Sequence, residues 1–196
     1  MKKVLIGAGG FAREIRAHMK QPDMICFVDD DYYHENNDNI LPLSQFDAKK
    51  YIALVAVGNP SDRLKITQRL PNGTKFFSFI HESAMILDNN IEIGEGSIIC
   101  AGSILTTNIK IGKHAHLNLH TTIGHDCVIG DYFTTAPGAK ISGNCNIGNS
   151  VYVGTNASIR EKINICNNVT IGLNAGVVKD IIESGIYGGV PAKKIK

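Results

Sequence analysis

The sequence lacks the features that mark membrane proteins and nucleic-acid-binding proteins. Its 196 residues contain no apolar run of about 18 residues, so no transmembrane helix is expected. The net charge is only +2, and no basic run exceeds two residues apart from the end, Lys193–Lys196, which we interpret as a solvated tail. The chain therefore has no strong electrostatic attraction to nucleic acid or to a membrane surface.

The sequence also lacks a targeting segment and a cysteine framework. No signal peptide is expected, because the first residues already have the pattern of a strand. The five cysteines are an odd number and have no metal-ligand spacing. Cys127 and Cys145 fall at positions that we expect to point inward, so they should stack in the core as reduced thiols. A cytoplasmic location is expected, because that compartment is reducing.

What the chain does contain is a six-residue repeat between Leu87 and Ile182. From Leu87 through Val177 every sixth residue is Leu, Ile or Val, and Thr135 is the only exception among sixteen positions. Four residues after each of these comes a second position, restricted mostly to Ser, Ala, Thr, Cys and Val. Gly follows the aliphatic residue seven times, at Gly94, Gly112, Gly124, Gly130, Gly148, Gly154 and Gly172.

A period of six fits neither an α-helix nor a simple strand. It predicts a parallel β-helix of the hexapeptide type, in which each aliphatic residue fills a corner of the core. The Gly, Asn and Asp residues around it supply the positive φ angles of tight turns. Three hexads make a coil of 18 residues, so the repeat should form about five coils joined by parallel ladders.

Residues 1–80 are expected to form a separate domain, followed by a coil domain at residues 81–196. We expect strands and helices at residues 2–6, 11–20, 24–28, 53–57, 61–69 and 75–80, with Ser61 as the cap of the second helix and residues 32–45 as a loop. The order strand, Gly-rich loop, helix, strand predicts a small Rossmann-like α/β unit. After Ile182 the sequence is neither helical nor periodic.

The loop Gly7-Ala8-Gly9-Gly10-Phe11-Ala12 nearly matches a dinucleotide-binding fingerprint, and Asp29 follows Gly9 by twenty residues, where a ribose-binding acid belongs. Backbone N–H groups at a helix N-terminus can hold a phosphate. The alternative is a tight strand-to-helix turn without a ligand. A dehydrogenase is disfavoured, because about eighty residues hold only half of a full dinucleotide fold.

His125 is the candidate general base. The repeat places it outward, with Gly143 one coil above and Thr107 one coil below, so the missing side chain at Gly143 should leave a slot for substrate. Asp126 follows at once, and a carboxylate bonded to one ring nitrogen fixes the tautomer and raises the basicity of the other. The alternative is a solvated surface histidine beside a turn aspartate.

Taken in order, these features resemble the bacterial nucleotide-linked amino-sugar N-acetyltransferases of the left-handed β-helix, hexapeptide-repeat acyltransferase family. The sialic-acid O-acetyltransferase-like subgroup shares the architecture. The resemblance rests on the Gly-rich unit, Asp29-Asp30, Gly58-Asn59, the repeat and the terminal Gly189–Lys193. It implies a left-handed coil, a homotrimer with active sites between subunits, acetyl-CoA as co-substrate, no metal, and a role in cell-surface polysaccharide biosynthesis.

The resemblance also implies roles for individual residues. The nucleotide of a UDP- or dTDP-type amino sugar would bind the N-terminal domain, through Gly9, Gly10, Phe11, Asp29, Asp30 and Gly58. Phe11 departs from the His that is common at its place. The catalytic pair would be His125 and Asp126, with Asp in place of the commoner Glu, assisted by Asn118. Acetyl-CoA would lie along Thr134, Thr155, Leu173, Gly189, Pro191, Ala192 and Lys193.

The expected reaction is direct attack of the sugar amine on the thioester, without a covalent enzyme intermediate. His125 would remove the proton as the amine attacks, and the backbone N–H of Gly143 would stabilise the oxyanion. Cys127 is adjacent in sequence but should point inward, so it is not expected to act as a nucleophile.

Three alternatives remain open. The γ-type carbonic anhydrases share this coil and bind zinc through three His, two of them five residues apart, as are His120 and His125, but Ala84 stands near the place of the third. A coil that serves only as a trimer scaffold is another. O-acetylation of sialic acid or a related sugar acid is the nearest rival. The sequence leaves open UDP, dTDP or GDP, the sugar, and the amino position.

Overall fold

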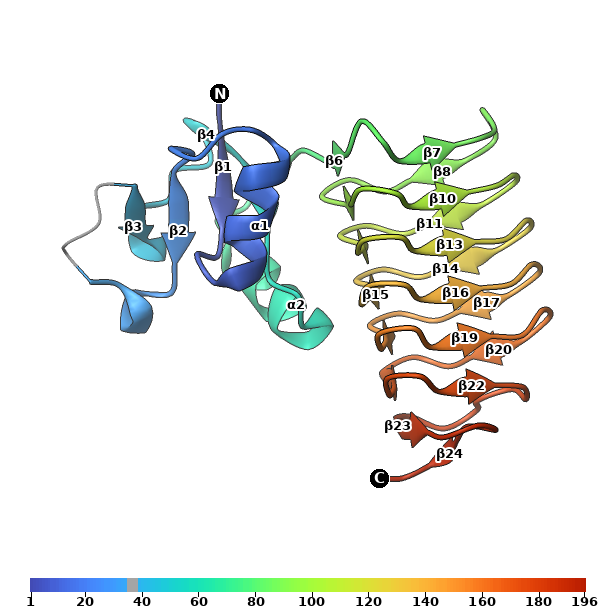
Figure 1. Ribbon diagram of the computed structural model, residues 1–196. Helices are drawn as coiled ribbons and strands as arrows, with labels where there is room; N and C mark the ends of the chain where they lie inside the picture. The colour runs from blue at the N-terminus through green and yellow to red at the C-terminus, as the bar shows by residue number, and fades with distance from the viewer. Residues whose placement is uncertain (35–38) are drawn as a thin grey trace.

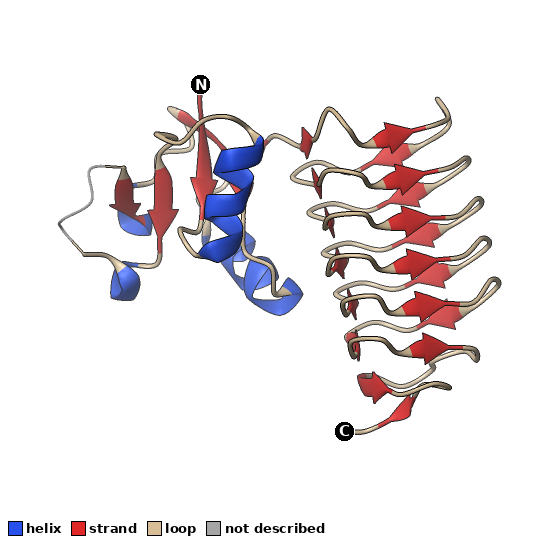
Figure 2. Cartoon of the chain, in the orientation of Figure 1, coloured by secondary structure: helices blue, strands red, loops and turns tan. Residues whose placement is uncertain are grey.

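The computed structural model describes residues 1–34 and 39–196 (Figure 1). Its N-terminal unit is a five-stranded parallel sheet of order β3-β2-β1-β4-β5. The elements of this unit are β1 (Lys2–Ile6), α1 (Gly10–His18), β2 (Cys26–Val28), the 3-10 turn η1 (Asp30–Tyr32), β3 (Ile40–Pro42), the 3-10 turn η2 (Leu43–Gln45), β4 (Tyr51–Val55), α2 (Pro60–Arg69) and β5 (Lys75–Phe76). Among the described residues, helices occur only in this unit (Figure 2).

Three expectations for the N-terminal unit were wrong. The segment predicted as a loop at 32–45 contains the edge strand β3, although its residues 35–38 lie outside the described part. The strand predicted at 75–80 is two strands, and the second belongs to the coil. The cap of α2 is Asn59, whose side-chain oxygen accepts from the N–H groups of Ser61 and Asp62 at 2.9 and 3.1 Å.

The rest of the chain is a parallel β-helix with three sheets, which we call the eight-, six- and five-stranded faces. The eight-stranded face holds β6 (Phe79–Ile80), β9 (Ile98–Ile99), β12 (His116–Leu117), β15 (Thr134–Thr135), β18 (Tyr152–Val153), β21 (Val169–Ile171), β23 (Gly185–Gly188) and β24 (Lys193–Lys194). The six-stranded face holds β7 (Met85–Ile86), β10 (Ile104–Leu105), β13 (Thr122–Ile123), β16 (Lys140–Ile141), β19 (Ser158–Ile159) and β22 (Gly176–Val177). The five-stranded face holds β8 (Glu92–Ile93), β11 (Lys110–Ile111), β14 (Val128–Ile129), β17 (Asn146–Ile147) and β20 (Asn164–Ile165).

The predicted period of 18 is confirmed by the ladder pairs, in which Ile111 pairs with Ile129 and Ile129 with Ile147. The phase of the first coil was wrong. Ile86, not Leu87, pairs with Leu105, and Leu87 is 58% exposed. The turn between Ile86 and Ile93 therefore holds one residue more than the later turns, and the regular array begins at Ile93.

Glycine serves two purposes in the coil: it supplies the expected positive φ at Gly96, Gly102 and Gly138, and elsewhere it allows close approach of neighbouring coils. Positive φ recurs every sixth residue from Gly96 to Asn174, and most of these positions are Asn, His, Asp or Gly. The glycines that follow the aliphatic residues have ordinary φ and serve close approach. A Cβ at Gly154 would lie 2.7 Å from the backbone N of Leu173 in the next coil. Coil stacking thus selects glycine here, because any side chain would separate the coils.

A buried arginine joins the N-terminal unit to the eight-stranded face. Arg63 of α2 is 0% exposed, and its Nη1 donates to Val57 O at 2.7 Å, while its Nε donates to His114 O at 2.9 Å and its Nη2 to Thr134 Oγ1 at 2.7 Å. Burial lowers its pKa to about 9, so it stays protonated at neutral pH. No helix among the described residues is both long and apolar enough to cross a membrane.

Candidate active site

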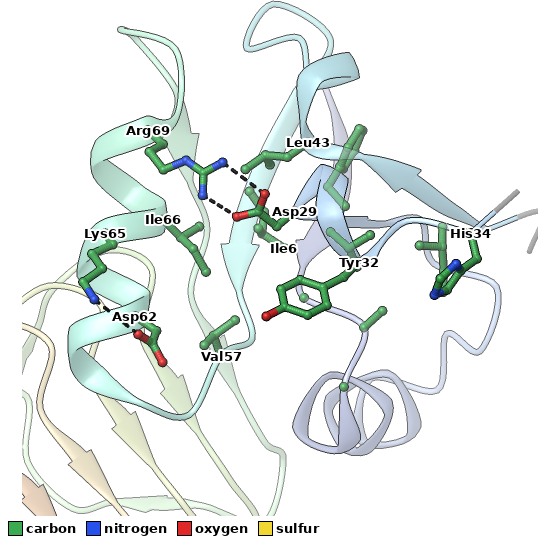
Figure 3. A pocket seen from close by; sticks show the side chains of 16 residues that line it. Ile6, Asp29, Tyr32, His34, Leu43, Val57, Asp62, Lys65, Ile66 and Arg69 are labelled. Atoms are coloured by element: carbon green, nitrogen blue, oxygen red, sulfur yellow. Dashed lines mark hydrogen bonds and ion pairs between the residues drawn. The ribbon is translucent and has the colours of Figure 1, made fainter.

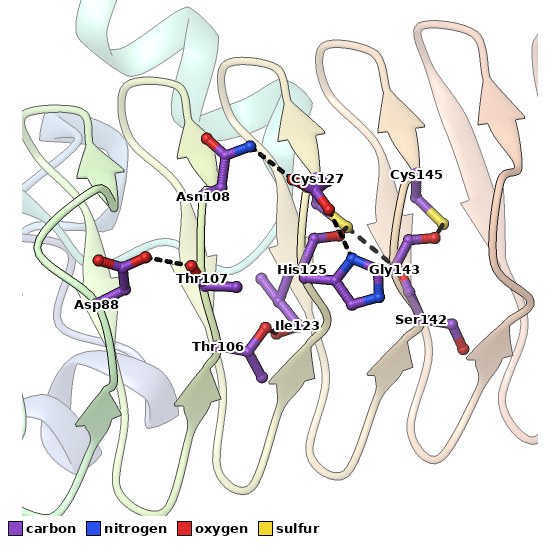
Figure 4. A network of polar contacts seen from close by, with 11 residues as sticks. Asp88, Thr106, Thr107, Asn108, Ile123, His125, Cys127, Ser142, Gly143 and Cys145 are labelled. Carbon is purple, nitrogen blue, oxygen red and sulfur yellow. Dashed lines mark hydrogen bonds and ion pairs between the residues drawn. The ribbon is translucent and has the colours of Figure 1, made fainter.

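His125 stands at the edge of the coil between β13 and β14, and it is held by a chain of hydrogen bonds (Figure 4). Its Nδ1 lies 2.7 Å from Asp126 Oδ2, and Asp126 Oδ1 accepts from Asn108 Nδ2 at 2.6 Å. The imidazole is 55% exposed. With Nδ1–H donating to the carboxylate, the lone pair is on Nε2, which is the arrangement a general base requires.

The turn geometry of the coil sets this arrangement. Asp126 and Asn108 occupy the positive-φ positions of consecutive coils, with φ of 58° and 50°, and Asp and Asn tolerate that conformation better than most residues. Their side chains are therefore stacked along the coil axis. The hydrogen bonds from Asn108 and then from His125 lower the pKa of Asp126, which keeps it ionised beside the ring.

The slot expected above His125 is filled by the ring itself. A Cβ at Gly143 would lie 2.6 Å from Nε2, so the glycine is what allows the imidazole to lie against the next coil. The backbone N–H of Gly143 has no acceptor among the described residues. In the preceding coil, a Cβ at Gly124 would lie 2.6 Å from this nitrogen.

Other predicted residues of the coil lie at a different edge. Asn118, Thr155 and Leu173 follow strands of the eight-stranded face, and Leu173 is 71% exposed. Asn118 Oδ1 accepts from Leu119 N at 2.7 Å, and no hydrogen bond joins it to His125 in the described part of the chain. The coil thus presents the two halves of the predicted site on separate edges.

Thr134 does not line an open groove, contrary to the expectation. It is 4% exposed, and its hydroxyl accepts from Arg63 and donates to Gly58 O at 3.2 Å. His116 is also buried there, beside Arg63 and the ring of Phe11, and burial holds its pKa well below the ordinary value. Neither side chain can meet a substrate.

The terminal segment closes the last coil. Gly189 O accepts from Gly176 N at 3.0 Å, and Ala192 N donates to Gly176 O at 2.8 Å. Lys193 pairs with Gly188 in the antiparallel ladder of β23 and β24, and Pro191 follows a cis peptide bond. Gly189, Pro191 and Lys193 are exposed along this end of the coil.

A second site is a cavity of about 710 Å³ in the N-terminal unit (Figure 3). Of the residues predicted for substrate binding, Gly9 and Asp29 line it. Gly10, Phe11, Asp30 and Gly58 do not. Phe11 packs on His116 instead, with ring centroids 5.2 Å apart, and Asp30 Oδ1 accepts from Ser44 N at 3.1 Å.

The sequence did not reveal two basic side chains that line this cavity, Lys65 paired with Asp62 at 3.8 Å and Arg69 paired with Asp29. Lys65 and Arg69 lie one turn apart on α2 and face the Gly-rich loop across the cavity, and Tyr32 lies between them and α1 (Figure 3). Nη1 and Nη2 of Arg69 donate to the carboxylate of Asp29, which lowers the Asp29 pKa. The spacing of four residues on the predicted helix was the available signal.

Two further features concern a cysteine nucleophile and a metal site. Cys127 is buried with a free thiol, and the hydrogen bond with Cys145 together with burial raises its pKa, so it is no nucleophile. Residues 1–34 and 39–196 contain no group of three or more His, Cys, Asp or Glu placed to hold a metal ion.

With its Gly-rich α/β unit, parallel β-helix and His–Asp pair on a coil edge, the chain is a two-part protein of the hexapeptide-repeat class. The family model for the PglD N-terminal domain matches residues 2–70. The structure of WeeI from Acinetobacter baumannii AYE is 31% identical, covers 100% of both chains and gives a TM-score of 0.90. The acetyltransferase domain of PglB from Neisseria gonorrhoeae FA1090, also solved with acetyl coenzyme A, is 27% identical over 99% of both chains with a TM-score of 0.84.

PerB from Caulobacter crescentus, solved with CoA and GDP-perosamine, shares the fold at 23% identity, covering 100% of this chain and 98% of PerB, with a TM-score of 0.87. Comparison with curated protein sequences finds no significant match. The full-length similarity to WeeI shows that the chain belongs to the sugar acetyltransferase family with a PglD-type N-terminal domain and a hexapeptide-repeat β-helix. It is an acetyl-CoA-dependent sugar acetyltransferase.

Proposed function

We propose that this enzyme acetylates the amino group of a nucleotide-linked amino-deoxy sugar, of the UDP or dTDP type, with His125 as the general base. The observation that carries the proposal is the exposed imidazole whose Nδ1 is held by Asp126 at 2.7 Å and whose Nε2 lies against Gly143 without a hydrogen-bond partner among the described residues. A base and an oxyanion donor next to each other are what amine attack on a thioester needs.

The reaction follows from these groups. The neutral amine attacks the thioester carbonyl while Nε2 of His125 takes a proton from its nitrogen. Asp126 stabilises the imidazolium, and the Gly143 N–H donates to the oxyanion of the tetrahedral intermediate. As the C–S bond breaks, His125 returns the proton to the departing CoA thiolate. The products are the amide and CoA, and the enzyme returns to its starting state.

The active site is proposed to lie between copies in a homotrimer. Along each coil the order of strands is eight-stranded, six-stranded, five-stranded face, and His125 stands between the last two. The N-terminal unit sits on the eight-stranded face (Figure 1). The His125 edge joins the other two faces, so it does not border the face that carries the N-terminal unit of the same chain. A sugar held by one N-terminal unit therefore needs His125 of a neighbouring copy.

Acetyl-CoA is proposed to lie between Thr155, Leu173 and the terminal segment of one copy and the His125 edge of the next. Asn118 lies on the same edge as Thr155, so it would reach the site from the side opposite to His125. The left-handed sense of the coil belongs to this proposal. So does the division into two domains, proposed from the sequence as residues 1–80 and 81–196, with the coil starting two residues earlier because β6 (Phe79–Ile80) already pairs with β9.

The 710 Å³ cavity is proposed to hold the nucleotide. Gly9 at the entry to α1 offers backbone N–H groups to a diphosphate, and Lys65 and Arg69 are donors on the opposite wall, where Asp62 and Asp29 balance their charge. Asp29 is proposed to bind the nucleoside, while Arg69 balances the charge of the Asp29 carboxylate. The complex of PerB with GDP-perosamine and CoA supports a nucleotide-linked amino sugar as the class of acceptor.

The test is a panel of UDP-, dTDP- and GDP-linked amino sugars, assayed for CoA release with acetyl-CoA, followed by mass spectrometry of the product. We expect an amide on one member of the panel. Ester formation on a free sugar acid, with no turnover of any nucleotide-linked amine, would contradict the proposal.

A further inference from the structure

The nucleotide cavity and the proposed base belong to different parts of the chain. The residues that line the cavity all fall between Ile6 and Arg69, in the N-terminal unit. His125 and Asp126 stand on the coil. The contact between the N-terminal unit and the coil therefore sets the orientation in which an acceptor held in the cavity is presented to the reacting groups.

The helix α2 takes part in both the cavity and this contact. One side of the helix lines the cavity with Asp62, Lys65, Ile66 and Arg69. Arg63 and Thr67, one turn apart, lie on another side of the helix and reach the coil. The hydroxyl oxygens of Thr67 and Tyr132 are 2.9 Å apart, and Arg63 is 0% exposed. A single helix thus links the wall of the cavity to the eight-stranded face.

Arg63 bonds to both partners of this contact. In the N-terminal unit its Nη1 donates to Val57 O at 2.7 Å and to Gly58 O at 3.1 Å, and Val57 itself lines the cavity. In the coil its Nε and Nη2 donate to four acceptors, His114 O at 2.9 Å, Tyr132 O at 3.0 Å, Phe133 O at 3.3 Å and Thr134 Oγ1 at 2.7 Å. Since His114 and Tyr132 stand on successive coils, one guanidinium ties the wall of the cavity to two coils.

The chemistry of this contact favours a role in orientation. Arg63 forms no ion pair with an acidic side chain among residues 1–34 and 39–196. A buried charge without a counter-ion loses its hydration, and apolar side chains of similar volume often stabilise a contact as well or better. The planar guanidinium instead supplies direction, because its N–H groups leave in a fixed fork.

We propose that Arg63 is a positioning residue for acetyl transfer, which fixes the N-terminal unit on the coil so that a bound acceptor is aimed at His125 of the neighbouring copy. The inference rests on the proposed function. Arg63 is fully buried and does not line the cavity, so it acts through α2 and the turn that begins at Val57. A displacement of about 1 Å can cost roughly 100-fold in rate, so loss of this orientation should appear in kcat.

The test is Arg63→Lys, which keeps the positive charge but lacks the fork of donors, assayed with the member of the nucleotide-sugar panel that the wild-type enzyme acetylates. We expect kcat to fall about 10- to 100-fold at temperatures well below the melting temperature of the variant. Calorimetric Kd for the matching nucleoside diphosphate should not change, because none of residues 79–196 lines the cavity. The pH profile of kcat/KM should keep its midpoint, since His125 and Asp126 are untouched.

Thr134→Val is a milder second variant, because it removes one acceptor of Arg63 with little change of shape. We expect kcat to fall about three- to tenfold, the effect of one hydrogen bond, again with unchanged Kd. This variant decides the question if Arg63→Lys does not fold. Arg16→Lys is the matched control, since Arg16 donates to Pro22 O at 3.1 Å within the N-terminal unit, and it should leave kcat and Kd unchanged.

Unchanged kcat in the folded variants, whatever their melting temperatures, would make Arg63 a purely stabilising contact and overturn the proposal. A rise in Kd for the nucleoside diphosphate that accounts for the lost activity would also overturn it, because Arg63 would then act through the cavity. If the wild type acetylates no member of the panel, the proposed function itself fails, which is a different result and is seen before any variant is assayed.

Discussion

Two histidines, nine residues apart, show how position in the coil decides chemistry. His125 stands on an exposed edge with a carboxylate on Nδ1, whereas His116 is 1% exposed on the eight-stranded face beside the buried Arg63. The first has a free nitrogen in solvent reach, and the second is kept neutral by its surroundings. The same residue type is therefore open to solvent on an edge, where it is our proposed base, and is a packing element on a covered face.

The largest expected effect is a loss of kcat when His125, on the exposed edge of the coil, is replaced. His125→Ala should lower kcat by roughly 10²–10⁴, the usual range for loss of a general base. KM should move less, because the base contributes mainly in the transition state. The unfolding transition should be unchanged, since the ring is exposed. Steady-state assays and thermal melts check both statements.

His120→Ala is the control for that prediction, because His120 is exposed at the neighbouring edge. Near-normal turnover in His125→Ala together with loss of turnover in His120→Ala would mean that the active edge has been misassigned.

On the eight-stranded face, beneath the N-terminal unit, a substitution should lower stability. Arg63→Met should lower the free energy of unfolding by about 3 kcal/mol or more, because it leaves several buried carbonyl groups without a donor. Urea denaturation measures the loss. Arg13→Met, at an exposed arginine of α1, is the matched control and should change stability by less than about 0.5 kcal/mol. Equal effects of the two variants would contradict the anchoring role of Arg63.

The buried histidines should also make the free energy of unfolding depend on pH. Burial lowers the pKa of His114 to about 4 and holds that of His116 well below its ordinary value. Between about pH 6.5 and 4 the unfolded chain takes up protons that these folded side chains do not. The free energy of unfolding should therefore fall with decreasing pH, by up to about 1.4 kcal/mol per unit for each histidine.

Denaturation curves across that range measure the slope. His114→Asn should reduce it, since Asn suits the positive φ of 54° at this position and does not titrate. A slope that is unaffected by this substitution would show that other groups carry the pH dependence.

The smallest effect on kcat is expected from the two residues that hold His125 in place, Asp126 and Asn108. Asp126→Ala should lower kcat by roughly tenfold, less than loss of His125, because the carboxylate orients the ring and does not carry the proton. Asn108→Ala should cost less again, but it should raise the pKa of Asp126 by removing the first hydrogen bond to it. An NMR titration of the carboxyl group checks the direction, and a lowered pKa would contradict the network.

The sequence predicts the repetitive part of the molecule better than the rest. A period of six between Ile93 and Val177 fixes which residues point inward, because every coil repeats the same environment. It could not reveal the extra residue between Ile86 and Ile93, since one irregular turn carries no repeat. The edge strand β3 was missed because its Pro42 and polar flanks resemble a loop.

In the candidate site, too, contacts between sequence neighbours were predictable and contacts between distant residues were not. His125 and Asp126 are neighbours in sequence, so their pairing could be predicted, and the structure bears out its geometry. Arg63 contacts residues about fifty to seventy positions away, and Arg69 contacts Asp29 across forty. Local patterns carry no information on such pairs. For the same reason the burial of Thr134 was not anticipated.

The central claim is that His125 of one copy serves a sugar held by another. Mixing two variants tests it most directly: His125→Ala, and the cavity double variant Lys65→Ala/Arg69→Ala assayed well below KM. After the two are unfolded and refolded together in equal amounts, a shared site predicts recovery of about a quarter of wild-type activity, because one site in four combines an intact edge with an intact cavity. No recovery above the separate variants would contradict the account and place each site within a single chain.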